Sequence, residues 1–193
     1  PHCGYGGRFY HWIFSNDPQP YYSFGNGAAM RVSAVGFAAR NIDEVKTLSR
    51  AVTAISHDHP EGLKGAESVA MAIFLARQSK TKQQIRGYIE QNYYKIGFTL
   101  DEIRGTYEFN ETCQNTVPQA FEAFFEAKDF EDAIRNAVSV GGDSDTLAAI
   151  TGSIAEAYFG VPFNLRKKAE SYIDNDTFRP VHTWLKRFEK MFP

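Results

Sequence analysis

Helix-start signals recur along this chain and leave little room for any other kind of secondary structure. Asn41, Thr81 and Thr99 each stand three residues before a Glu or Gln, which is the capping-box pattern of a helix N-terminus. Asp129 is a further N-cap candidate, and Pro60 suits a first helical turn. Apolar residues repeat at helical spacing after these positions. The sequence therefore predicts a largely helical chain.

Helix boundaries can be predicted at several other points. Val117-Pro118 is expected to begin a helix, because Pro is favoured in the first turn. Gly141-Gly142 is expected to interrupt helical structure. Further helices are expected over residues 143–159, 165–173 and 178–191. No Asn-Gly pair joins two alternating strands, so the prediction is an all-α fold with a single domain over residues 1–193.

The composition indicates which binding partners and which cellular setting to expect. The net charge is −2, which implies no strongly basic face, so nucleic acid is not an expected partner. No apolar run approaches the roughly 18 residues of a membrane span. Cys3 and Cys113 are the only two cysteines, too few for a disulfide framework, and they favour a reduced, cytoplasmic setting. A hydrophobic fraction of 43% is enough for a buried core.

The segment Gly141-Gly142-Asp143-Ser144-Asp145-Thr146 carries the clearest chemical signal. Two carboxylates and two hydroxyls follow a Gly pair, and hard oxygen donors suit Mg²⁺ or Ca²⁺ better than Zn²⁺. Asp and Ser are also preferred helix N-caps, so capping explains the same residues without a metal. Small residues line one side of the following helix and would let a neighbour approach closely: Ala148, Ala149, Gly152, Ser153 and Ala155.

Two other segments are candidate binding elements. Small residues surround Asn26 between Tyr22 and Arg31, and such a loop can expose backbone N–H groups to an anion or can simply be a turn. His57 and His59 are two residues apart, but no Cys or further His lies nearby to complete a metal site. A capping or substrate-contact role is therefore the more economical interpretation of this pair.

Taken together, three segments resemble the ADP-ribosylglycohydrolase family. They are Gly25-Asn26-Gly27-Ala28-Ala29-Met30-Arg31, the stretch from Ser56-His57 to Glu61-Gly62, and Gly141 to Thr146 with the residues that follow to Ala155. The resemblance spans nearly the whole chain, and the last motif is the most specific. It favours the metal interpretation of Asp143, Asp145 and Thr146 over capping.

The resemblance implies an all-α fold with a binuclear Mg²⁺ centre. Asp145 would be the ligand shared between the two ions, Asp143 and Thr146 would complete this side, and both carboxylates would serve in catalysis. The loop that holds the distal ribose and diphosphate would comprise Ser23, Phe24, Gly25, Asn26 and Gly27. His57 would belong to the adenosine side of the pocket. The implied activity is Mg²⁺-dependent hydrolysis of an ADP-ribosyl glycosidic bond, with ADP-ribose or an ADP-ribosylated protein or small molecule as ligand.

This sequence departs from the family pattern at one point. The family carries an N-terminal Thr-Asp-Asp-Thr segment that supplies the other metal ligands, and no Thr-Asp-Asp-Thr occurs here. We therefore expect the family fold without its N-terminal part, weak Mg²⁺ binding, little activity from this chain alone, and self-association through exposed core surface. The alternatives are a non-catalytic ADP-ribose-binding module and a structural relative of the lens-crystallin kind.

Overall fold

The computed structural model describes residues 5–173, 179–180, 182–183 and 186–187. Residues 5–173 form α-helices and no β-strand, which confirms the all-α prediction. The helices are α1 (Gly7–Ile13), α2 (Gly27–Met30), α3 (Ser33–Ala38), α4 (Ile42–Thr53), α5 (Pro60–Arg77), α6 (Lys82–Asn92), α7 (Leu100–Ile103), α8 (Cys113–Glu126), α9 (Phe130–Val140), α10 (Ser144–Phe159) and α11 (Phe163–Glu170).

The chain divides into two compact units, Pro1–Phe159 and Gly160–Pro193. The first unit contains α1 to α10 and every segment that the sequence singles out as a candidate site. The second unit contains α11. A single domain over residues 1–193 stays a prediction.

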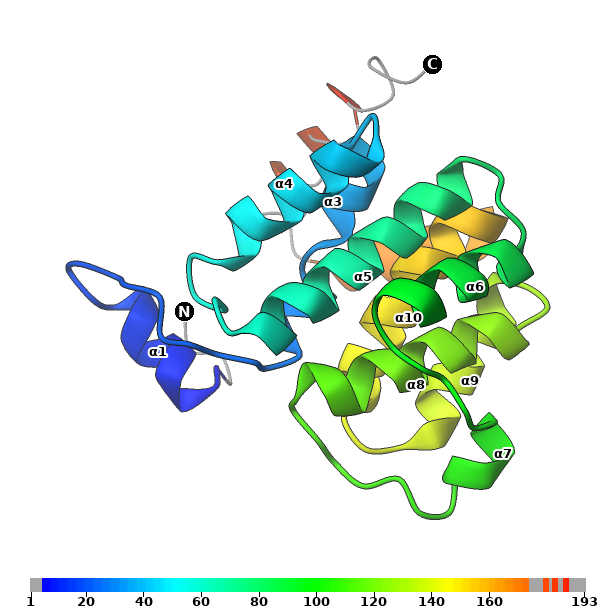
Figure 1. The fold of residues 1–193 in the computed structure, drawn as a ribbon. Coiled ribbons are helices and arrows are strands. Elements are labelled where there is room, and N and C mark those ends of the chain that lie inside the picture. The colour runs from blue at the N-terminus through cyan, green and yellow to red at the C-terminus, as the bar shows by residue number, and fades with distance from the viewer. Residues whose placement is uncertain (1–4, 174–178, 181, 184–185, 188–193) are drawn as a thin grey trace. The chain divides into compact units, whose positions relative to one another are not determined.

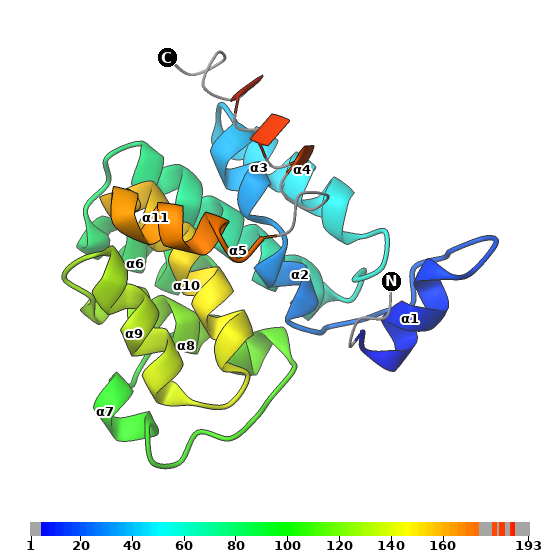
Figure 2. The ribbon, with the colours of Figure 1, turned by 180° about the vertical axis from the view of Figure 1, so that it is seen from behind.

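Two helices form the centre of the first unit. Helix α5 packs against α2, α3, α4, α6, α8 and α10, and α10 also packs against α8 and α9 (Figure 1). Helices α8, α9 and α10 lie side by side when seen from behind (Figure 2). The largest fully buried side chains come mainly from these elements and include Met71, Ile73, Phe121, Phe124, Leu147, Ile150 and Ile154. Burial of this apolar surface stabilises the bundle.

Glycines allow two of these helix contacts to be close. A Cβ on Gly36 of α3 would lie 2.6 Å from Cβ of Ile73 in α5. A Cβ on Gly152 of α10 would lie 2.8 Å from Cδ1 of Ile134 in α9. Of the small residues predicted along α10, Gly152 is therefore where α9 approaches, whereas Ala149 is exposed. This contact supports the helix whose N-terminal end carries the Asp-Ser-Asp-Thr motif.

The helix starts predicted from local caps are confirmed. The side chains of Asn41, Thr81 and Asp129 accept hydrogen bonds from backbone N–H groups at the starts of α4, α6 and α9. Thr99 and Glu102 form the expected capping box of α7, and α5 begins at Pro60. Each cap is a contact within three residues, which explains why the sequence alone reveals it.

The predicted start of α8 is wrong. The helix begins at Cys113, so Pro118 lies inside it rather than in its first turn. A Pro in the second turn loses one backbone hydrogen bond. Tertiary contacts offset this loss, because Cys113 and Thr116 in the first turn are both fully buried. Helix α11 covers Phe163–Glu170 instead of the predicted 165–173, and the helix predicted over 178–191 lies largely outside the described residues.

Helix α4 has its larger apolar side chains on the solvent side. Leu48, Val52 and Ile55 follow the predicted helical spacing along α4 and the turn after it, yet they are 38%, 43% and 49% exposed. The face that packs on α5 instead buries Val45, together with the hydroxyl residues Ser49 and Thr53. The periodicity thus predicted the helix correctly without showing which face is buried.

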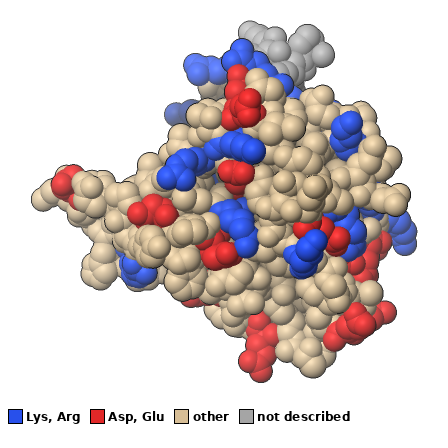
Figure 3. Space-filling view, in the orientation of Figure 1, with Lys and Arg blue, Asp and Glu red and all other residues tan. Residues whose placement is uncertain are grey.

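Charged side chains are mixed on the surface. Lys and Arg side chains alternate with Asp and Glu side chains on the face shown in Figure 3, and no large area of one sign is seen there. This mixture accords with the small net charge of −2. None of the described helices combines the length and the hydrophobicity that crossing a membrane requires.

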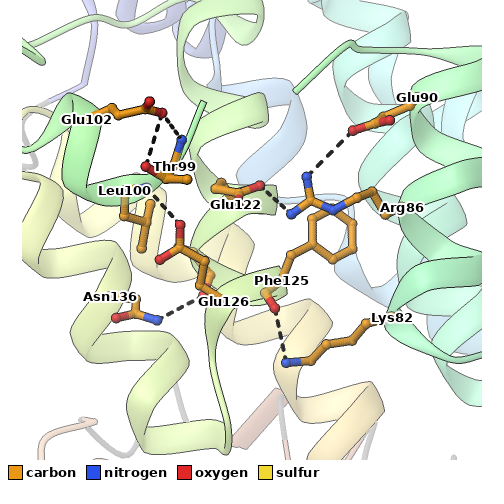
Figure 4. Close-up of polar contacts among 11 residues, drawn as sticks. Lys82, Arg86, Glu90, Thr99, Leu100, Glu102, Glu122, Phe125, Glu126 and Asn136 are labelled. Carbon is orange, nitrogen blue, oxygen red and sulfur yellow. Dashed lines mark hydrogen bonds and ion pairs between the residues drawn. The ribbon is translucent and has the colours of Figure 1, made fainter. Parts of the chain in front are cut away.

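A polar network joins α6 to α8 (Figure 4). Nη2 of Arg86 lies 2.6 Å from Oε2 of Glu122, whose side chain is only 5% exposed. Burial raises the pKa of Glu122, and the charge and hydrogen bond of Arg86 oppose that rise. The Arg86 guanidinium also lies 4.4 Å from the ring centroid of Phe125. A buried carboxylate of this kind depends on its cation.

Candidate functional site

The Gly-rich loop, residues 23–27, is held by a segment far along the sequence. The N–H of Asn26 donates to the carbonyl of Glu111 at 2.7 Å, and the N–H of Cys113 donates to the carbonyl of Phe24 at 3.0 Å. The Cys113 thiol adds a contact of 3.2 Å to the Gly25 carbonyl. The start of α8 therefore fixes the loop in place.

Not every N–H group of this loop is available to a ligand. The N–H of Gly25 donates to Oγ of Ser23 at 3.2 Å, and the N–H of Asn26 is used by Glu111. The Ser23 hydroxyl thus supports the loop itself. The prediction that the loop exposes its backbone donors is wrong for these two amides.

Aromatic rings flank the loop on its exposed side. Tyr22 and Phe24 are 59% and 40% exposed, and both rings contact the ring of His59, with centroid distances of 4.6 and 5.1 Å. Tyr22 has a φ of 54°, an uncommon value for a residue with a side chain. The carboxylate of Asp58 accepts a hydrogen bond of 2.7 Å from the N–H of Tyr22 and holds this conformation. Strained backbone of this kind is often found at binding sites.

The loop and the Asp-Ser-Asp-Thr motif meet through one hydrogen bond. Nδ2 of Asn26 lies 2.6 Å from Oδ2 of Asp143, across 117 positions of sequence. Asn26 is only 6% exposed, so this contact is shielded from solvent. The structure therefore brings together two of the segments that the sequence singled out separately.

The Gly pair places Asp143 at this meeting point. Gly141 and Gly142 have φ values of 81° and 62°, which favour glycine. A Cβ on Gly142 would also lie 2.5 Å from Cε1 of Tyr107. The hydroxyl of Tyr107 donates to the carbonyl of Asn115 at 2.8 Å, so its ring is fixed over the turn. Both the backbone angles and the close ring exclude larger residues at position 142.

The two carboxylates of the motif interact with each other. Burial raises the pKa of Asp143 and the Asp145 carboxylate raises it further, while hydrogen bonds from Asn26 and Thr146 oppose the rise. The hydrogen bond with Asp143 and the N–H of Thr146 lower the pKa of Asp145. The N–H of Thr146 lies 2.9 Å from Oδ1 of Asp145. Ionisation of Asp143 is therefore disfavoured by its partial burial and by the neighbouring carboxylate.

This donor set fits a hard divalent cation in part. Mg²⁺ is commonly held by one or two carboxylates together with water and substrate oxygens, and Asp143 and Asp145 are two such carboxylates. Thr146 adds a hydroxyl oxygen beside them. Within the described part of the chain, no group of three or more His, Cys, Asp or Glu side chains could hold a metal. The residues present would thus supply only one side of a cation site.

His57 lies beneath the loop rather than on its surface. It is 5% exposed, and its Nδ1 lies 2.8 Å from the Ser56 hydroxyl and 3.3 Å from Nη2 of Arg31. Because a guanidinium can only donate, Nδ1 is the acceptor and the proton lies on Nε2. A Cβ on Gly25 or on Gly27 would be 3.5 Å from that Nε2. His57 therefore supports both glycines from below.

The surroundings of His57 make the stability of the protein depend on pH. Burial, and then the nearby positive charges of Arg31 and Arg8, lower the pKa of His57 to about 4. The folded state therefore resists protonation of this ring, and stability is lost as the pH falls from about 6.5 towards 4. We expect a loss on the order of 2 kcal/mol from this group.

Urea unfolding at several pH values from 7 to 4.5 tests this expectation. His57→Gln cannot be protonated, so its stability should fall less than that of the wild type over this range. Ser56→Ala keeps the imidazole and should retain the wild-type pH dependence. Parallel stability curves for His57→Gln and the wild type would contradict the assignment.

The structure unites several predicted residues and adds others. Ser23, Phe24, Gly25, Asn26 and Gly27 form one loop above His57, and Asn26 joins them to Asp143, with Asp145 and Thr146 beside it. The predicted capping role is confirmed for His59, whose Nδ1 accepts a hydrogen bond from the N–H of Glu61 at the start of α5. The residues that the sequence did not single out are Tyr107 and Thr116. No local pattern marks these two, because their contacts depend on tertiary packing. Cys3 lies outside the described residues, and Cys113 is a free, buried thiol.

Comparison with known proteins gives consistent results. The family model described as ADP-ribosylglycohydrolase matches residues 4–187. The human protein ADP-ribosylhydrolase ARH3 is 27% identical over 203 residues, covering 80% of this chain and 56% of its own length. A protein of Archaeoglobus fulgidus is 27% identical over 153 residues, covering 70% of this chain and 50% of its own length.

A solved structure shares the fold. The structure titled "ADP-ribosylglycohydrolase-related protein complex" has a TM-score of 0.64 and 25% identity, covering 81% of this chain and 59% of that chain. This chain spans about half the length of the relatives that it matches. The similarity therefore covers most of this chain and only part of each relative.

Proposed function

Because this chain belongs to the ADP-ribosylglycohydrolase family, we propose that it takes part in Mg²⁺-dependent hydrolysis of an ADP-ribosyl glycosidic bond. The observation that carries the proposal is the 2.6 Å hydrogen bond between Asn26 and Asp143. It puts the loop that would receive the ADP-ribosyl group next to the carboxylates that would hold the cation. The substrate would be an ADP-ribosylated protein or small molecule.

The residues of this chain would divide the work in the following way. Asp143, Asp145 and Thr146 would hold Mg²⁺, which when bound orients the ribose hydroxyls and makes water more acidic. Asp145 is the more solvent-exposed carboxylate and can accept a proton from the attacking water. Cleavage of the bond at the anomeric carbon passes through an oxocarbenium-like transition state, which nearby carboxylates stabilise.

The loop above His57 would orient the rest of the ligand. Phe24 and the neighbouring ring of Tyr22 offer exposed aromatic surface on which a planar group can pack. Gly25 and Gly27 leave room for the buried His57 ring beneath the loop, because a Cβ on either would lie 3.5 Å from its Nε2. The His57 ring packs beneath both glycines and restricts their position.

The proposal is tested by release of ADP-ribose from defined substrates. The chain is incubated with peptides ADP-ribosylated on serine or on arginine, with Mg²⁺ or with EDTA, and free ADP-ribose is measured by chromatography. We expect Mg²⁺-dependent release that is slow, because this chain supplies only one side of the cation site. No release from either peptide, together with no binding of ADP-ribose, would refute the proposal.

A second function is favoured by the partial donor set. The described residues offer two carboxylates and one hydroxyl, and a site of this kind can bind ADP-ribose without positioning water for attack. ADP-ribose binding measured by calorimetry, without turnover on either peptide, would identify a binding module. In that case Mg²⁺ would change the affinity for ADP-ribose without producing a product.

A further inference from the structure

The side-chain N–H donors of Asn26 are fully used within the protein. Its Nδ2 lies 2.6 Å from Oδ2 of Asp143, 3.1 Å from Oγ1 of Thr116 and 3.4 Å from the carbonyl of Asn110. A primary amide has only two N–H bonds, and three acceptors already surround them. The amide therefore has no donor left for a substrate.

The chemistry of its neighbours fixes the orientation of this amide. Oγ1 of Thr116 donates to the carbonyl of Asn110 at 3.1 Å, so the same hydroxyl can accept from Asn26. A rotated amide would place its oxygen 2.6 Å from an oxygen of Asp143 and would lose the bond to Thr116. Nδ2 therefore faces the carboxylate.

We infer that Asn26 is a positioning residue for Asp143 and does not donate a hydrogen bond to the substrate through Nδ2. By holding Oδ2 of Asp143, it would restrict rotation of that carboxylate and keep it beside Asp145. Because the backbone of Asn26 belongs to the Gly-rich loop, the same residue ties the position of the loop to that of the cation site. The inference rests on the proposed function, since it assigns Asn26 a role within the same site.

If Asn26 only positions Asp143, removing its amide should lower the affinity for Mg²⁺ and leave the affinity for ADP-ribose unchanged. A residue that only orients a metal ligand typically changes metal affinity by about 10- to 100-fold. Asn26→Ala should therefore weaken Mg²⁺ binding by at least about tenfold. The affinity for ADP-ribose in EDTA should stay close to that of the wild type, because Nδ2 has no N–H left to donate to the ligand.

Calorimetric titrations of the full chain with Mg²⁺, and with ADP-ribose in EDTA, give both affinities. Asn26→Gln keeps an amide but places it at the wrong distance from Asp143, so it should weaken Mg²⁺ binding as well. This second variant still tests the inference if Asn26→Ala fails to fold. Asn136→Ala is the matched control: it removes a part-buried amide whose Nδ2 lies 3.4 Å from the carbonyl of Ala123, outside the loop and the motif, and it should leave Mg²⁺ affinity unchanged.

The outcomes separate this inference from the proposed function. Unchanged Mg²⁺ affinity in both Asn26 variants would overturn the inference, and so would weaker ADP-ribose binding in EDTA. Either result would leave the proposed function intact. A wild-type chain that binds neither Mg²⁺ nor ADP-ribose would refute the proposed function itself.

Discussion

Replacing Asp145 with Asn is expected to lower both Mg²⁺ affinity and Mg²⁺-dependent release of ADP-ribose by about 100-fold or more. The substitution removes one of the two carboxylates that would hold the cation, and also the exposed carboxylate that would accept a proton. Fold stability should fall only slightly, because Asp145 is exposed and Asn keeps a side-chain oxygen that can accept from the N–H of Thr146. Loss of function with a nearly unchanged thermal midpoint is the combined result to expect.

The comparison needs a matched control on the same chain. Asp101 lies at the start of α7, where it forms an ion pair with Arg104. Asp101→Asn removes an equal charge and should leave Mg²⁺ affinity unchanged. Calorimetry measures the affinity and chromatography measures the release. An Asp145→Asn protein that retains both at wild-type levels would exclude Asp145 from the cation site.

The largest effect on stability is expected from Arg86→Ala. This change leaves Glu122, which is nearly buried, without the cation 2.6 Å away. Removing one partner of a buried pair costs about 3 to 5 kcal/mol, and we expect about 3 because the Arg86 side chain is partly exposed. For a chain of this size that corresponds to a fall of roughly 6 to 12 °C in the thermal midpoint. Urea unfolding and thermal unfolding measure the change.

A double variant identifies the cause of that loss. Glu122→Gln removes the charge and keeps the shape, so Arg86→Ala with Glu122→Gln should recover much of the stability. The deficit of Arg86→Ala alone should also shrink as the pH is lowered, because Glu122 can then take up a proton. A double variant as unstable as Arg86→Ala would mean that the packing of Arg86 on Phe125 matters more than the charge.

The local parts of the fold could be predicted from sequence. Asn41, Thr81, Thr99 and Asp129 mark helix starts because each cap is completed within three residues. The start of α8 could not be found in this way. It depends on Cys113 packing against Gly65 of α5, where a Cβ on Gly65 would lie 2.6 Å from Sγ.

Burial was harder to predict than helix formation. The spacing of Leu48 and Val52 predicts a helix, and α4 is one, but both residues face solvent while Ser49 and Thr53 are buried. Hydrophobic periodicity indicates that a helix has two different faces, but it does not indicate which face packs against other helices. The partner of each face is a property of the tertiary structure.

The candidate site could likewise be predicted only in part from the sequence. The Gly-Gly-Asp-Ser-Asp-Thr motif could be recognised from residue types, because hard oxygen donors after a flexible turn are typical of Mg²⁺ sites. The hydrogen bond between Asn26 and Asp143 spans 117 positions, and no local pattern predicts it. The same holds for Tyr107, whose ring excludes any side chain at Gly142.

The central claim is that the Gly-rich loop and the Asp-Ser-Asp-Thr motif form one binding site. Amide NMR spectra of the ¹⁵N-labelled chain, titrated with ADP-ribose in the presence of Mg²⁺, test it most directly. We predict that signals of residues 23–27 and of residues 143–147 shift together with one apparent dissociation constant. Replacing Mg²⁺ by paramagnetic Mn²⁺ should broaden both sets. Shifts confined to one of the two segments, or centred elsewhere on the protein, would contradict the account.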